Sequence, residues 1–385
     1  MTRQLAAILA ARNRMRGRPV RSIAEALAAA ADRWRHDPEV RTHLARTTDM
    51  SPAMLSTVLP LVAEAITADA LVELHAREAE AHGPALIAHV LASNVPALAV
   101  PAIALSCLAG AAVVVKSGRA DGVSAPAFAR AVAHVDRELG ATIFTTYWPR
   151  EAMEAERTVL AAADVVTITG TNEAIATVSR RTKARVVAHG ARTSVALMRD
   201  DAPAAEIAAL ALDIVLYEQR GCLSPTTVFV DGGADLRRFA RDMVAALDAA
   251  AVPLPVPQST ATRGSRRVAL ETARFAGATV LEGRGCAVVL GLPPGAMDDA
   301  LMGRTIAIRP LDADSLAPFR RGEIECIGVG GMVEISEGFF REHGVSRVCP
   351  VGRMQRPRID WPRGQRPALG SLFRDEYEPR IQVES

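Results

Sequence analysis

The sequence predicts an α/β protein built on parallel sheets. Between residues 86 and 188, short apolar or β-branched runs alternate with helical segments, and such βαβ alternation places parallel strands between layers of helices. Further helix and strand patterns follow from residue 202 onward. The chain has 385 residues, of which 49% are hydrophobic, so two domains and a sizeable core are expected.

The first half of the chain divides into a helical part and the alternating part. Residues 1 to about 80 are rich in Ala and Arg, and helices are expected over 23–34 and 51–65, the second capped by Asp49 or Ser51. In the alternating part, strands are expected over 86–91, 111–116, 142–147, 164–169 and 184–188, and helices over 97–108, 124–139, 151–162 and 172–181.

The second half is organised around a joint between a helix and a strand. A helical run over 202–217 leads into Gln219-Arg220-Gly221-Cys222, and a β-branched run over 226–230 leads out of it as a buried strand. Helices are then expected over 234–249 and 260–275, and strands over 286–290 and 305–309. Beyond residue 328 the chain is rich in Gly, Pro and Arg.

Composition argues against several classes of function. The net charge is +2 and aromatic residues make up 4% of the chain, so no nucleic acid partner is expected. Five widely spaced cysteines without a CxxC pair argue against a disulfide framework or a metal site and favour a reducing cytoplasm. The most apolar stretch, 95–115, is interrupted by Pro96 and Pro101, so we expect a helix and a strand there rather than a membrane span.

Polar residues fall at the ends of three expected strands. Asn94 follows the first strand, Lys116 ends the second, and Gly170-Thr171 follows the fourth. Ligands of parallel sheets bind at the carboxyl ends of the strands, so these residues mark a candidate ligand edge. Lys116 is one of only two lysines in an Arg-rich chain, which indicates either a use for a compact ammonium or a lysine kept by chance. No GxGxxG or GxxxxGK[ST] motif follows a strand, so an ordinary Rossmann dehydrogenase is not expected.

Cys222 is the candidate nucleophile. Gly221 allows close approach to the backbone and Pro225 stops any helix, so the thiol can lie on a tight joint that faces a cleft. The alternative is a buried structural cysteine, because unpaired Cys is among the most buried residue types. The segment alone is compatible with both interpretations.

The chain resembles the aldehyde dehydrogenase superfamily, and most of all its acyl-thioester-reducing branch, the LuxC-type long-chain acyl-CoA reductases. The resemblance runs from about Leu86 to the C-terminus and depends on the order and spacing of several motifs. They are Ser93-Asn94-Val95-Pro96, Val113 to Gly118, Thr169-Gly170-Thr171, Gln219 to Cys222, and the tail Gly344 to Pro357 with Trp361. It implies an aldehyde dehydrogenase-like fold, with a helical part and dinucleotide-binding domain over 1–190, a catalytic domain over 191–345, and a tail over 346–385 that packs back near the active site.

The resemblance also implies roles for the residues that match these motifs. Cys222 corresponds to the thiol nucleophile, and Asn94 to the residue whose amide forms the oxyanion hole with the Cys222 N–H group. Lys116 corresponds to the lysine that holds the adenosine ribose of a nicotinamide cofactor. Gly170 and Thr171 correspond to the small pair beside the cofactor pyrophosphate. The structural alternatives are a turn residue for Asn94 and a helix entry for Gly170 and Thr171.

Departures from the superfamily pattern refine the expected chemistry. Ala188 stands where aldehyde-oxidising members carry a Glu that activates water, so transfer of an acyl group from a thiol is favoured over hydrolysis, and the neighbouring His189 is a weaker candidate for assisting protonation. Arg119 stands where NAD-preferring members often carry a Glu, and a guanidinium can pair with a 2′-phosphate, so NADP(H) is expected unless Arg119 is simply an exposed arginine. Ala300 stands where a Glu usually contacts the nicotinamide ribose, which leaves the group that holds this ribose open.

The sequence therefore predicts NADPH-dependent reduction of an acyl thioester, on CoA or on a carrier, to the aldehyde through an acyl-Cys222 intermediate. The alternatives are an aldehyde dehydrogenase-like oxidoreductase acting on an aldehyde or acyl phosphate, and a non-catalytic assembly subunit. The other cysteines are expected to be structural, with Cys349 as a second candidate thiol. We expect a cytoplasmic homo-oligomer, with an acyltransferase or synthetase as a candidate partner and no membrane span.

Overall fold

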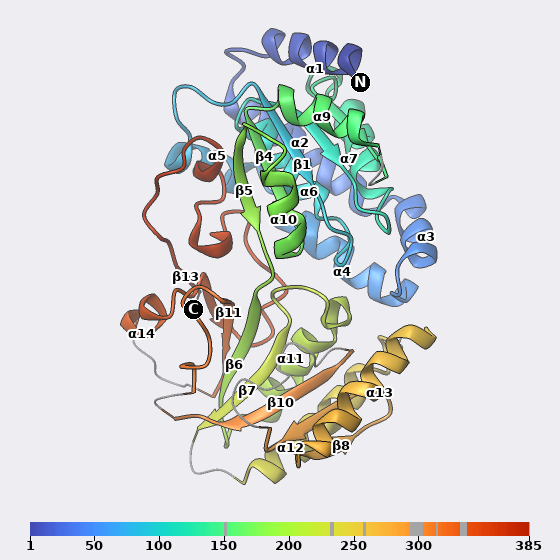
Figure 1. The fold of residues 1–385 in the computed structure, drawn as a ribbon, viewed down its shortest axis with the longest axis vertical. Coiled ribbons are helices and arrows are strands. Elements are labelled where there is room, and N and C mark those ends of the chain that lie inside the picture. The colour runs from blue at the N-terminus through green and yellow to red at the C-terminus, as the bar shows by residue number, and fades with distance from the viewer. Residues whose placement is uncertain are drawn as a thin grey trace. The chain divides into compact units, whose positions relative to one another are not determined.

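Two compact units make up the chain in the computed structural model (Figure 1). The first contains Met1–Thr48, Leu59–Ala191 and Arg358–Pro379, and the second contains Asp49–Val58, Arg192–Pro357 and Arg380–Ser385. The structure describes the whole chain except residues 150–151, 232–234, 257–258, 293–302, 313–314, 332–336 and 385. The expected position Ala300 therefore lies outside the described residues.

The first unit is built on a five-stranded parallel sheet, as predicted. Its strands are β1 (Leu86–Val90), β2 (Ala112–Lys116), β3 (Ile143–Thr146), β4 (Val165–Thr169) and β5 (Arg185–His189). Their order is β3-β2-β1-β4-β5. Successive crossovers lead from β1 to β2 and β3 on one side, and to β4 and β5 on the other. The order thus reverses between β1 and β4, which is the place where open parallel sheets bind ligands.

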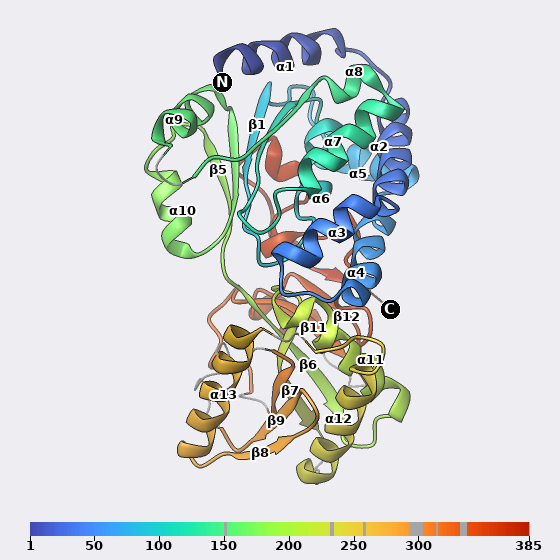
Figure 2. The ribbon, with the colours of Figure 1, turned by 90° about the vertical axis from the view of Figure 1, so that its right-hand side faces the viewer.

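Helices cover both faces of this sheet, which explains why its central strands are almost continuously apolar. On one face, Leu5 and Ile8 of α1 (Thr2–Arg14) and Leu160 of α9 (Met153–Ala162) form a core with the β1 side chains Leu86 and Ala88. α10 (Asn172–Ser179) adds to the same layer. α6 (Ala99–Leu108) packs on β1 and β2, α7 (Ser124–Val135) packs on β3, and α2 (Val20–Arg35) packs on these two helices (Figure 2). The remaining helical elements are α3 (Pro38–Thr47), α5 (Ala68–Glu78), α8 (Arg137–Gly140), η3 (Arg363–Gln365) and η4 (Gly370–Leu372).

The structure corrects one local expectation and decides between two alternatives in another. The helix expected over 124–139 is divided at Asp136, because the Asp136 carboxylate accepts hydrogen bonds from the N–H groups of Glu138 and Leu139 and so begins a new helix, α8. Of the two caps proposed for α4 (Pro52–Glu64), Ser51 is the correct one, since its Oγ accepts from the N–H of Met54 at 3.1 Å. The Asp49 carboxylate is engaged by Arg220, Ser259 and Thr262 instead.

The second unit is also α/β and contains an eight-stranded sheet. Its strands are β6 (Thr193–Arg199), β7 (Pro225–Asp231), β8 (Thr279–Glu282), β9 (Ala287–Leu290), β10 (Thr305–Pro310), β11 (Ile324–Val329), β12 (Arg347–Pro350) and β13 (Gln382–Val383). They follow the order β13-β12-β11-β6-β7-β10-β9-β8, and among these described strands only the pair β8–β9 is antiparallel. Its helical elements are α11 (Ala204–Val215), η1 (Leu216–Gln219), α12 (Leu236–Ala250), α13 (Thr260–Phe275) and α14 (Glu337–Glu342). The predicted fold class is confirmed in both units.

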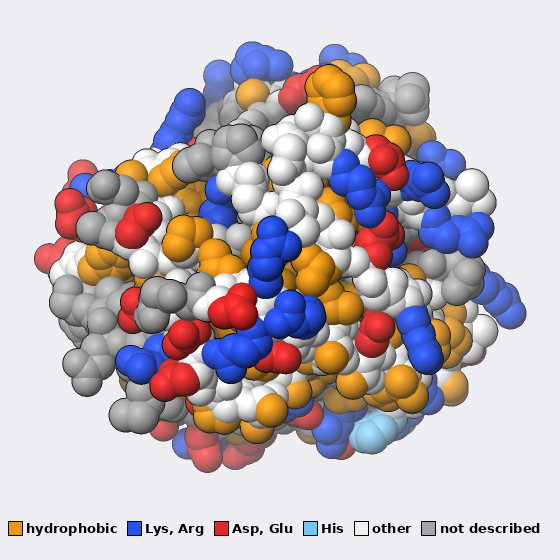
Figure 3. Space-filling view, turned by 90° about the horizontal axis from the view of Figure 1, so that it is seen from below, with side chains coloured by type: hydrophobic (Ala, Val, Ile, Leu, Met, Phe, Trp, Pro, Cys, Tyr) orange, Lys and Arg blue, Asp and Glu red, His pale blue; other side chains and the backbone are white. Residues whose placement is uncertain are grey.

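Charged side chains of both signs share the molecular surface. On the face shown in Figure 3, acidic and basic side chains are interspersed, in keeping with the net charge of +2. Within the described part of the chain, no single helix is long and apolar enough to cross a membrane, although the bent pair α4 and α5 meets that criterion when taken together.

Candidate active site

The carboxyl edge of the first unit's sheet gathers most of the predicted site residues. Val90, the last residue of β1, pairs with Lys116 at the end of β2 and with Ile168 of β4, so the ends of these strands lie level. Asn94, which is exposed, lies on the loop after β1, and Gly170 and Thr171 follow β4. The structure therefore brings Asn94, Lys116, Gly170 and Thr171 to one edge, at the reversal of strand order.

The loop that carries Asn94 is braced by the loop after β2. The buried carboxylate of Asp121 accepts a hydrogen bond from the N–H of Ala97 at 2.7 Å and another from the N–H of Ser124 at 3.0 Å. Ala97 has a φ of +66°, a left-handed conformation that is unfavourable for a residue with a Cβ and that this hydrogen bond stabilises. Gly118 lies so close to the first loop that a Cβ atom there would be 2.6 Å from the Cβ of Ser93. The backbone around Asn94 is thus held in place from the neighbouring strand.

Lys116 and Arg119 provide positive charge at this edge. The half-buried Lys116 ends β2, and its Nζ lies 5.9 Å from the ring centroid of Tyr147, which follows β3. Arg119 is exposed on the loop after β2. An ammonium at the strand end and a guanidinium beyond it are groups that can bind an anionic or hydroxyl-rich ligand.

Gly170 and Thr171 form the entry to α10. The N–H of Gly170 donates to the backbone oxygen of His189 at 3.2 Å, and the Thr171 Oγ1 caps α10 by accepting from the N–H of Ala174 at 3.3 Å. A Cβ atom at Gly170 would meet only the Cβ of Ala174, at an ordinary 3.5 Å. Packing within the described chain therefore does not require glycine at this position, and the space beside it is open to a ligand.

His189 ends β5 and lines a small cavity of about 50 Å³ together with His89, Thr167, Arg363 and Arg366. His89 is fully buried, and its ring nitrogens bond the hydroxyls of Thr167 and Ser106. Burial, together with the charge of Arg363, lowers the pKa of His89 to about 3, so this imidazole is neutral at physiological pH.

Ala188 lies on the face of β5 that packs against the core formed with α1, α9 and α10. The position at which the sequence lacks a hydrolytic Glu is therefore an apolar side chain within a hydrophobic cluster. No carboxylate is available from this residue to activate water.

Cys222 lies in the second unit, on a turn between η1 and β7 that we call the cysteine turn (Gly221–Ser224). The N–H of Ser224 donates to the oxygen of Gly221 at 3.0 Å and closes the turn around Cys222 and Leu223. Cys222 is half-buried, whereas Cys107, Cys286, Cys326 and Cys349 are buried. Among the five cysteines, it is thus the one residue that is partly exposed.

The backbone before the cysteine turn is strained and firmly held. Tyr217, Glu218 and Gln219 have φ values of +57°, +55° and +58°, which are left-handed conformations for residues with a Cβ. Glu218 forms a bidentate ion pair with Arg304 at 2.7 and 2.9 Å, and both side chains are 1% exposed. Burial raises the pKa of Glu218, and the adjacent guanidinium opposes that shift.

Gln219 connects the same segment to β10. Its Nε2 donates to the oxygen of Thr305 at 2.7 Å and to that of Pro225 at 2.8 Å, and its Oε1 accepts from the N–H of Thr305 at 3.0 Å. The Gln219 amide thus bonds both the backbone N–H and the backbone oxygen of Thr305 in β10. This pair of hydrogen bonds fixes the position of the segment relative to the sheet. The strained conformation is therefore over-determined by its surroundings, as is typical of functional sites.

Two further contacts hold the cysteine turn itself. The buried Ser194 of β6 donates from Oγ to the backbone oxygen of Cys222 at 2.6 Å. The buried Gln355 donates from Nε2 to the Oγ of Ser224 at 3.0 Å and to the backbone oxygen of Asp213 at 2.9 Å. Gln355 belongs to a segment that we call the tail turn (Val351–Arg356).

Arg220, two residues before Cys222, donates to the carboxylate of Asp49 at 3.1 Å. The same carboxylate accepts hydrogen bonds from Ser259 and Thr262 at the start of α13. Burial alone would raise the pKa of Asp49, but these hydrogen bonds and the Arg220 guanidinium lower it below its ordinary value. This is why Asp49 does not cap α4.

The other cysteines are part of the packing. Burial raises the pKa of Cys107 to about 12, and burial with a hydrogen bond to Asp248 raises that of Cys286 to about 12. The Sγ atoms of Cys326 and Cys349 lie 3.7 Å apart between β11 and β12. Cys349, the second candidate thiol, is 1% exposed and is therefore poorly placed to attack a substrate.

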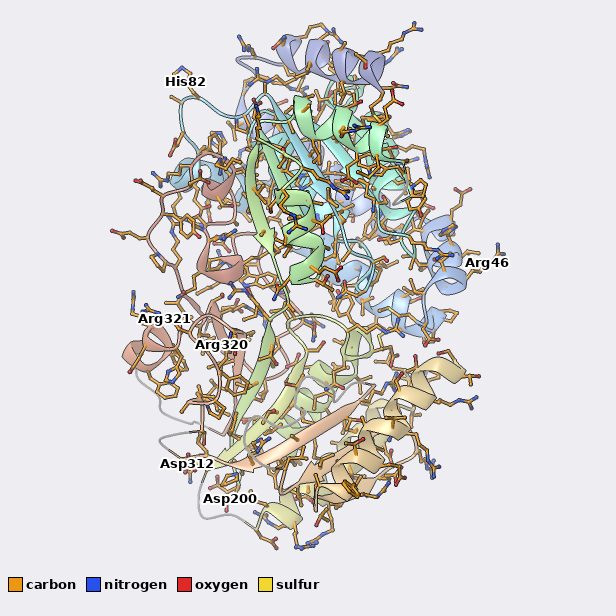
Figure 4. The ribbon with its side chains drawn as sticks, in the orientation of Figure 1. Arg46, His82, Asp200, Asp312, Arg320 and Arg321 are labelled. Atoms are coloured by element: carbon orange, nitrogen blue, oxygen red, sulfur yellow. The ribbon has the colours of Figure 1, made fainter. Side chains whose placement is uncertain are left out.

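Sequence reasoning missed the residues that hold the two loops. Each of Asp121, Ser194, Arg304 and Gln355 contacts one of these segments through a partner at least 24 positions away along the chain. Gln355 lies in the tail segment that carries the resemblance, but that segment assigns it no role, and the other three lie outside the motifs. Glu218 and Gln219 are visible beside Cys222, but their partners follow only from the fold. Within the described ranges, no group of three His, Cys, Asp or Glu side chains could hold a metal ion. The side chains labelled in Figure 4, such as Arg46 and His82, project from the periphery of the ribbon and take no part in these groupings.

Comparison with known proteins identifies relatives in sequence and in fold. The family model described as "Acyl-CoA reductase (LuxC)" matches residues 18–372. A long-chain acyl-protein thioester reductase of Photobacterium leiognathi is 30% identical over 151 residues, which cover 37% of this chain and 31% of that relative. The match therefore spans less than a third of the relative's length.

Solved structures of aldehyde dehydrogenases share the fold. An aldehyde dehydrogenase of Physcomitrella patens, crystallised with succinate, superposes with a TM-score of 0.73 at 14% identity, covering 93% of this chain and 82% of its own. A glyceraldehyde-3-phosphate dehydrogenase of Methanocaldococcus jannaschii, crystallised with NADP, gives a TM-score of 0.70 at 13% identity, covering 90% of this chain and 84% of its own. The expected aldehyde dehydrogenase-like fold is confirmed.

Proposed function

Because the chain belongs to the acyl-CoA reductase (LuxC) family, we propose that it reduces an acyl thioester to the aldehyde through an acyl group carried by Cys222. The observation that carries this proposal is the cysteine turn. It presents the one half-buried thiol among the five cysteines on a backbone fixed by Ser194, Gln219 and Gln355. A nucleophile must be reachable by substrate and held still, and the turn meets both conditions.

We further propose that the carboxyl edge of the first unit's sheet binds a nicotinamide cofactor, NADP(H) in preference to NAD(H). The residues fit such a group: Lys116 and Arg119 offer positive charge, the space beside Gly170 is open, and Thr171 begins α10, whose N-terminus favours phosphate. Arg119 can pair with a 2′-phosphate, and this supports NADP(H). When bound, the cofactor supplies the hydride that reduces the acyl carbon. The first unit would then serve as the cofactor domain and the second as the thiol domain.

The chemistry that we assign to the chain begins at Cys222. Its thiolate attacks the carbonyl carbon of the thioester, and a bond forms between that carbon and the Cys222 sulfur. The bond between the carbonyl carbon and the sulfur of CoA or the carrier then breaks, and this second thiol leaves. The Asn94 amide and the Cys222 N–H are assigned to the oxyanion of the tetrahedral intermediate, where one donor is typically worth about 3 kcal/mol. Because Ala188 provides no carboxylate, water is not activated at that position and the acyl group is retained for reduction.

The relative from Photobacterium leiognathi is described as acting on long-chain acyl-protein thioesters, and this supports a fatty acyl group on CoA or on a protein carrier. The homo-oligomer, the synthetase or acyltransferase partner and the cytoplasmic location stay predictions from the sequence.

Labelled substrates test the proposed function. We expect acyl-CoA of suitable chain length to label Cys222 covalently and to yield aldehyde when NADPH is added. Acyl phosphate and free aldehyde serve as comparison substrates for the alternative oxidoreductase. Cys222→Ala should abolish the labelling, while Cys349→Ala, which changes a buried thiol, should keep it. Label on another residue, or aldehyde formation by Cys222→Ala at the wild-type rate, would refute the assignment.

The oxyanion role has its own test. Asn94→Ala should lower turnover by about two orders of magnitude, because one donor to the developing negative charge is lost. Asn94 is exposed, so the substitution should leave the unfolding midpoint nearly unchanged. Unchanged turnover would remove Asn94 from the oxyanion hole.

A further inference from the structure

The tail turn, Val351–Arg356, is built into the second unit by two buried charged residues. Arg347 has no exposed surface, and its guanidinium donates to the backbone oxygens of Met354 at 2.8 Å and of Arg353 at 2.9 Å. Glu384 balances its charge at 2.8 Å. Carbonyl groups of the turn therefore accept hydrogen bonds from a β12 side chain, and the turn is not a loose surface loop.

Asp213 of α11 holds the other side of the same turn. It is 1% exposed, and its Oδ2 accepts a hydrogen bond from the N–H of Gly352. Gly352 has a φ of +87°, and a Cβ atom there would lie 2.9 Å from the Cβ of Ala209, so α11 and the turn are in direct contact. The Oδ1 of Asp213 has no hydrogen-bond partner by geometry among the described residues, and the backbone N–H groups of Met354 and Gln355 act on the same carboxyl together with that of Gly352.

Gln355 connects the tail turn and α11 to the turn that carries Cys222. It is 4% exposed, and one amide nitrogen spans the backbone oxygen of Asp213 and the hydroxyl of Ser224. Ser224 in turn closes the cysteine turn through its N–H bond to Gly221. The two residues of the turn between these ends are Cys222 and Leu223. A displacement of Gln355 would therefore be passed directly to the backbone that carries the thiol.

We propose that Gln355, supported by Asp213, is a positioning residue that fixes the cysteine turn for acyl transfer. This inference rests on the proposed function, since it assumes that Cys222 accepts the acyl group. The side-chain amide of Gln355 donates to Ser224 and to Asp213, so it acts on Cys222 through the backbone of the cysteine turn. Its effect is to hold the angle at which Cys222 meets the thioester carbon, and misalignment of a nucleophile lowers the rate of the chemical step rather than the amount of folded enzyme.

Single-turnover acylation separates positioning from mere stability. The full chain is mixed with a labelled saturated acyl-CoA, and both the rate constant of Cys222 acylation and the final fraction acylated are measured. Gln355→Met keeps the side-chain length but removes both donors. We expect its rate constant to fall about tenfold, as the loss of one or two hydrogen bonds implies, while the final fraction stays at the wild-type value. Arg353→Met, a change in an exposed side chain of the same turn, is the matched control and should match wild type.

Substitutions of Asp213 test whether this residue holds the tail turn that contains Gln355. Asp213→Asn keeps an oxygen that can accept from Gly352 and should restore most of the rate lost in Asp213→Leu, which has no acceptor. If both residues act through the same turn, Asp213→Leu combined with Gln355→Met should lose little more than either alone.

The possible failures are distinguishable. A Gln355→Met rate constant equal to wild type overturns the inference, and so does a loss confined to the final fraction acylated, because that indicates damage to folding alone. A wild-type chain that takes no acyl group at Cys222 overturns the proposed function and, with it, this inference. If Asp213→Leu fails to fold, the comparison of Asp213→Asn and Gln355→Met with wild type still decides the matter.

Discussion

The pKa of the Asp213 carboxyl group is determined mainly by burial. Burial raises its pKa to about 7, although N–H groups of the tail turn, first among them that of Gly352, act in the opposite direction. In the unfolded chain the same group has a pKa near 3.8. Between these two values the folded state holds a proton that the unfolded state has released, so the carboxyl is largely protonated in the folded protein at mildly acidic pH.

This difference makes the stability of the protein depend on pH in a defined direction. Because the folded pKa is raised, the stabilisation is complete below about pH 4 and declines as the pH rises toward 7, by roughly 1.4 kcal/mol per pH unit. In Asp213→Asn the titrating group is absent. We therefore expect the free energy of unfolding of wild type minus that of the variant to decrease from pH 5 to pH 7 and to level off above it.

Urea denaturation at several pH values measures this difference. Asp242→Asn, at an exposed position on α12, is the control and should follow the wild-type pH profile. Parallel profiles for wild type and Asp213→Asn would mean that burial does not shift this carboxyl.

The sequence assigns roles to the candidate reacting and binding residues, but it does not show the contacts of the residues that support them. Cys222, Asn94 and Lys116 stand in patterns that a single chain displays. Ser194 and Gln355 contact the cysteine turn from 28 and 131 residues away along the chain, through hydrogen bonds that only the fold creates. No local pattern of a Ser in a strand or a Gln in a turn distinguishes such a contact from an ordinary polar residue.

Among the elements, the loops after β1 and β2 act as one structure. Gly118 allows this contact because it has no side chain, and Asp121 stabilises it by accepting from Ala97. The loop after β1 carries Asn94, so its position depends on a residue of the neighbouring loop. The requirement for glycine here comes from close packing rather than from backbone conformation.

Gly118→Ala should therefore displace the Asn94 loop. The added Cβ would lie 2.6 Å from the Cβ of Ser93 and 2.8 Å from a backbone carbon of Ala92, and backbone atoms cannot move aside as a flexible side chain can. We expect a fall in acyl reduction of about tenfold or more, in line with the sensitivity of catalysis to small displacements, with a lower unfolding midpoint. Steady-state turnover and thermal unfolding measure the two effects.

Gly122→Ala is the matched control in the same loop. A Cβ there meets nothing within 4 Å and the backbone does not require glycine, so turnover should be unchanged and stability slightly higher by about 0.4–1 kcal/mol. Equal turnover in the two variants would mean that the loop tolerates displacement and does not position Asn94.

Element boundaries show where pattern reasoning succeeds and where tertiary structure overrides it. The five strands of the first unit lie where β-branched runs predict them, because helices cover both faces of that sheet and select continuous apolar sequence. β6 and β11 are central in the second sheet, but the sequence pattern predicts neither. β6 contains Ala196, Leu197 and Met198, which are residues of helical preference. In β11 the β-branched residues are interrupted by Glu325 and Gly328, which are depleted in strands, so neither segment shows an unbroken β-branched run.

For the whole molecule, the candidate groups are divided between two independently packed units. The residues assigned to the cofactor, Lys116, Arg119, Gly170 and Thr171, belong to the first unit, and Cys222 belongs to the second. Each unit has its own sheet and its own hydrophobic clusters. Ligand binding to the first unit should therefore be detectable without any chemistry at the thiol.

This division leads to a prediction about cofactor binding. NADPH that binds the folded chain should raise its stability by about 2.7 kcal/mol at a concentration one hundred times its dissociation constant. Backbone amides at the ends of β1, β2 and β4 should gain protection from hydrogen exchange, because the assigned residues follow those strands. The same result is expected for Cys222→Ala, since Cys222 is not among the residues assigned to cofactor binding. NADH should stabilise less than NADPH at equal concentration.

Arg119→Ala tests the origin of that preference. Removing the guanidinium should lower the stabilisation by NADPH and leave that by NADH nearly unchanged, because only NADPH carries a 2′-phosphate for Arg119 to pair with. Arg3→Ala, at an exposed position on α1, is the control and should keep the wild-type preference. Stronger stabilisation by NADH in the wild-type chain would overturn the assignment of Arg119, and protection confined to the second unit would overturn the assignment of the cofactor to the β1–β4 edge.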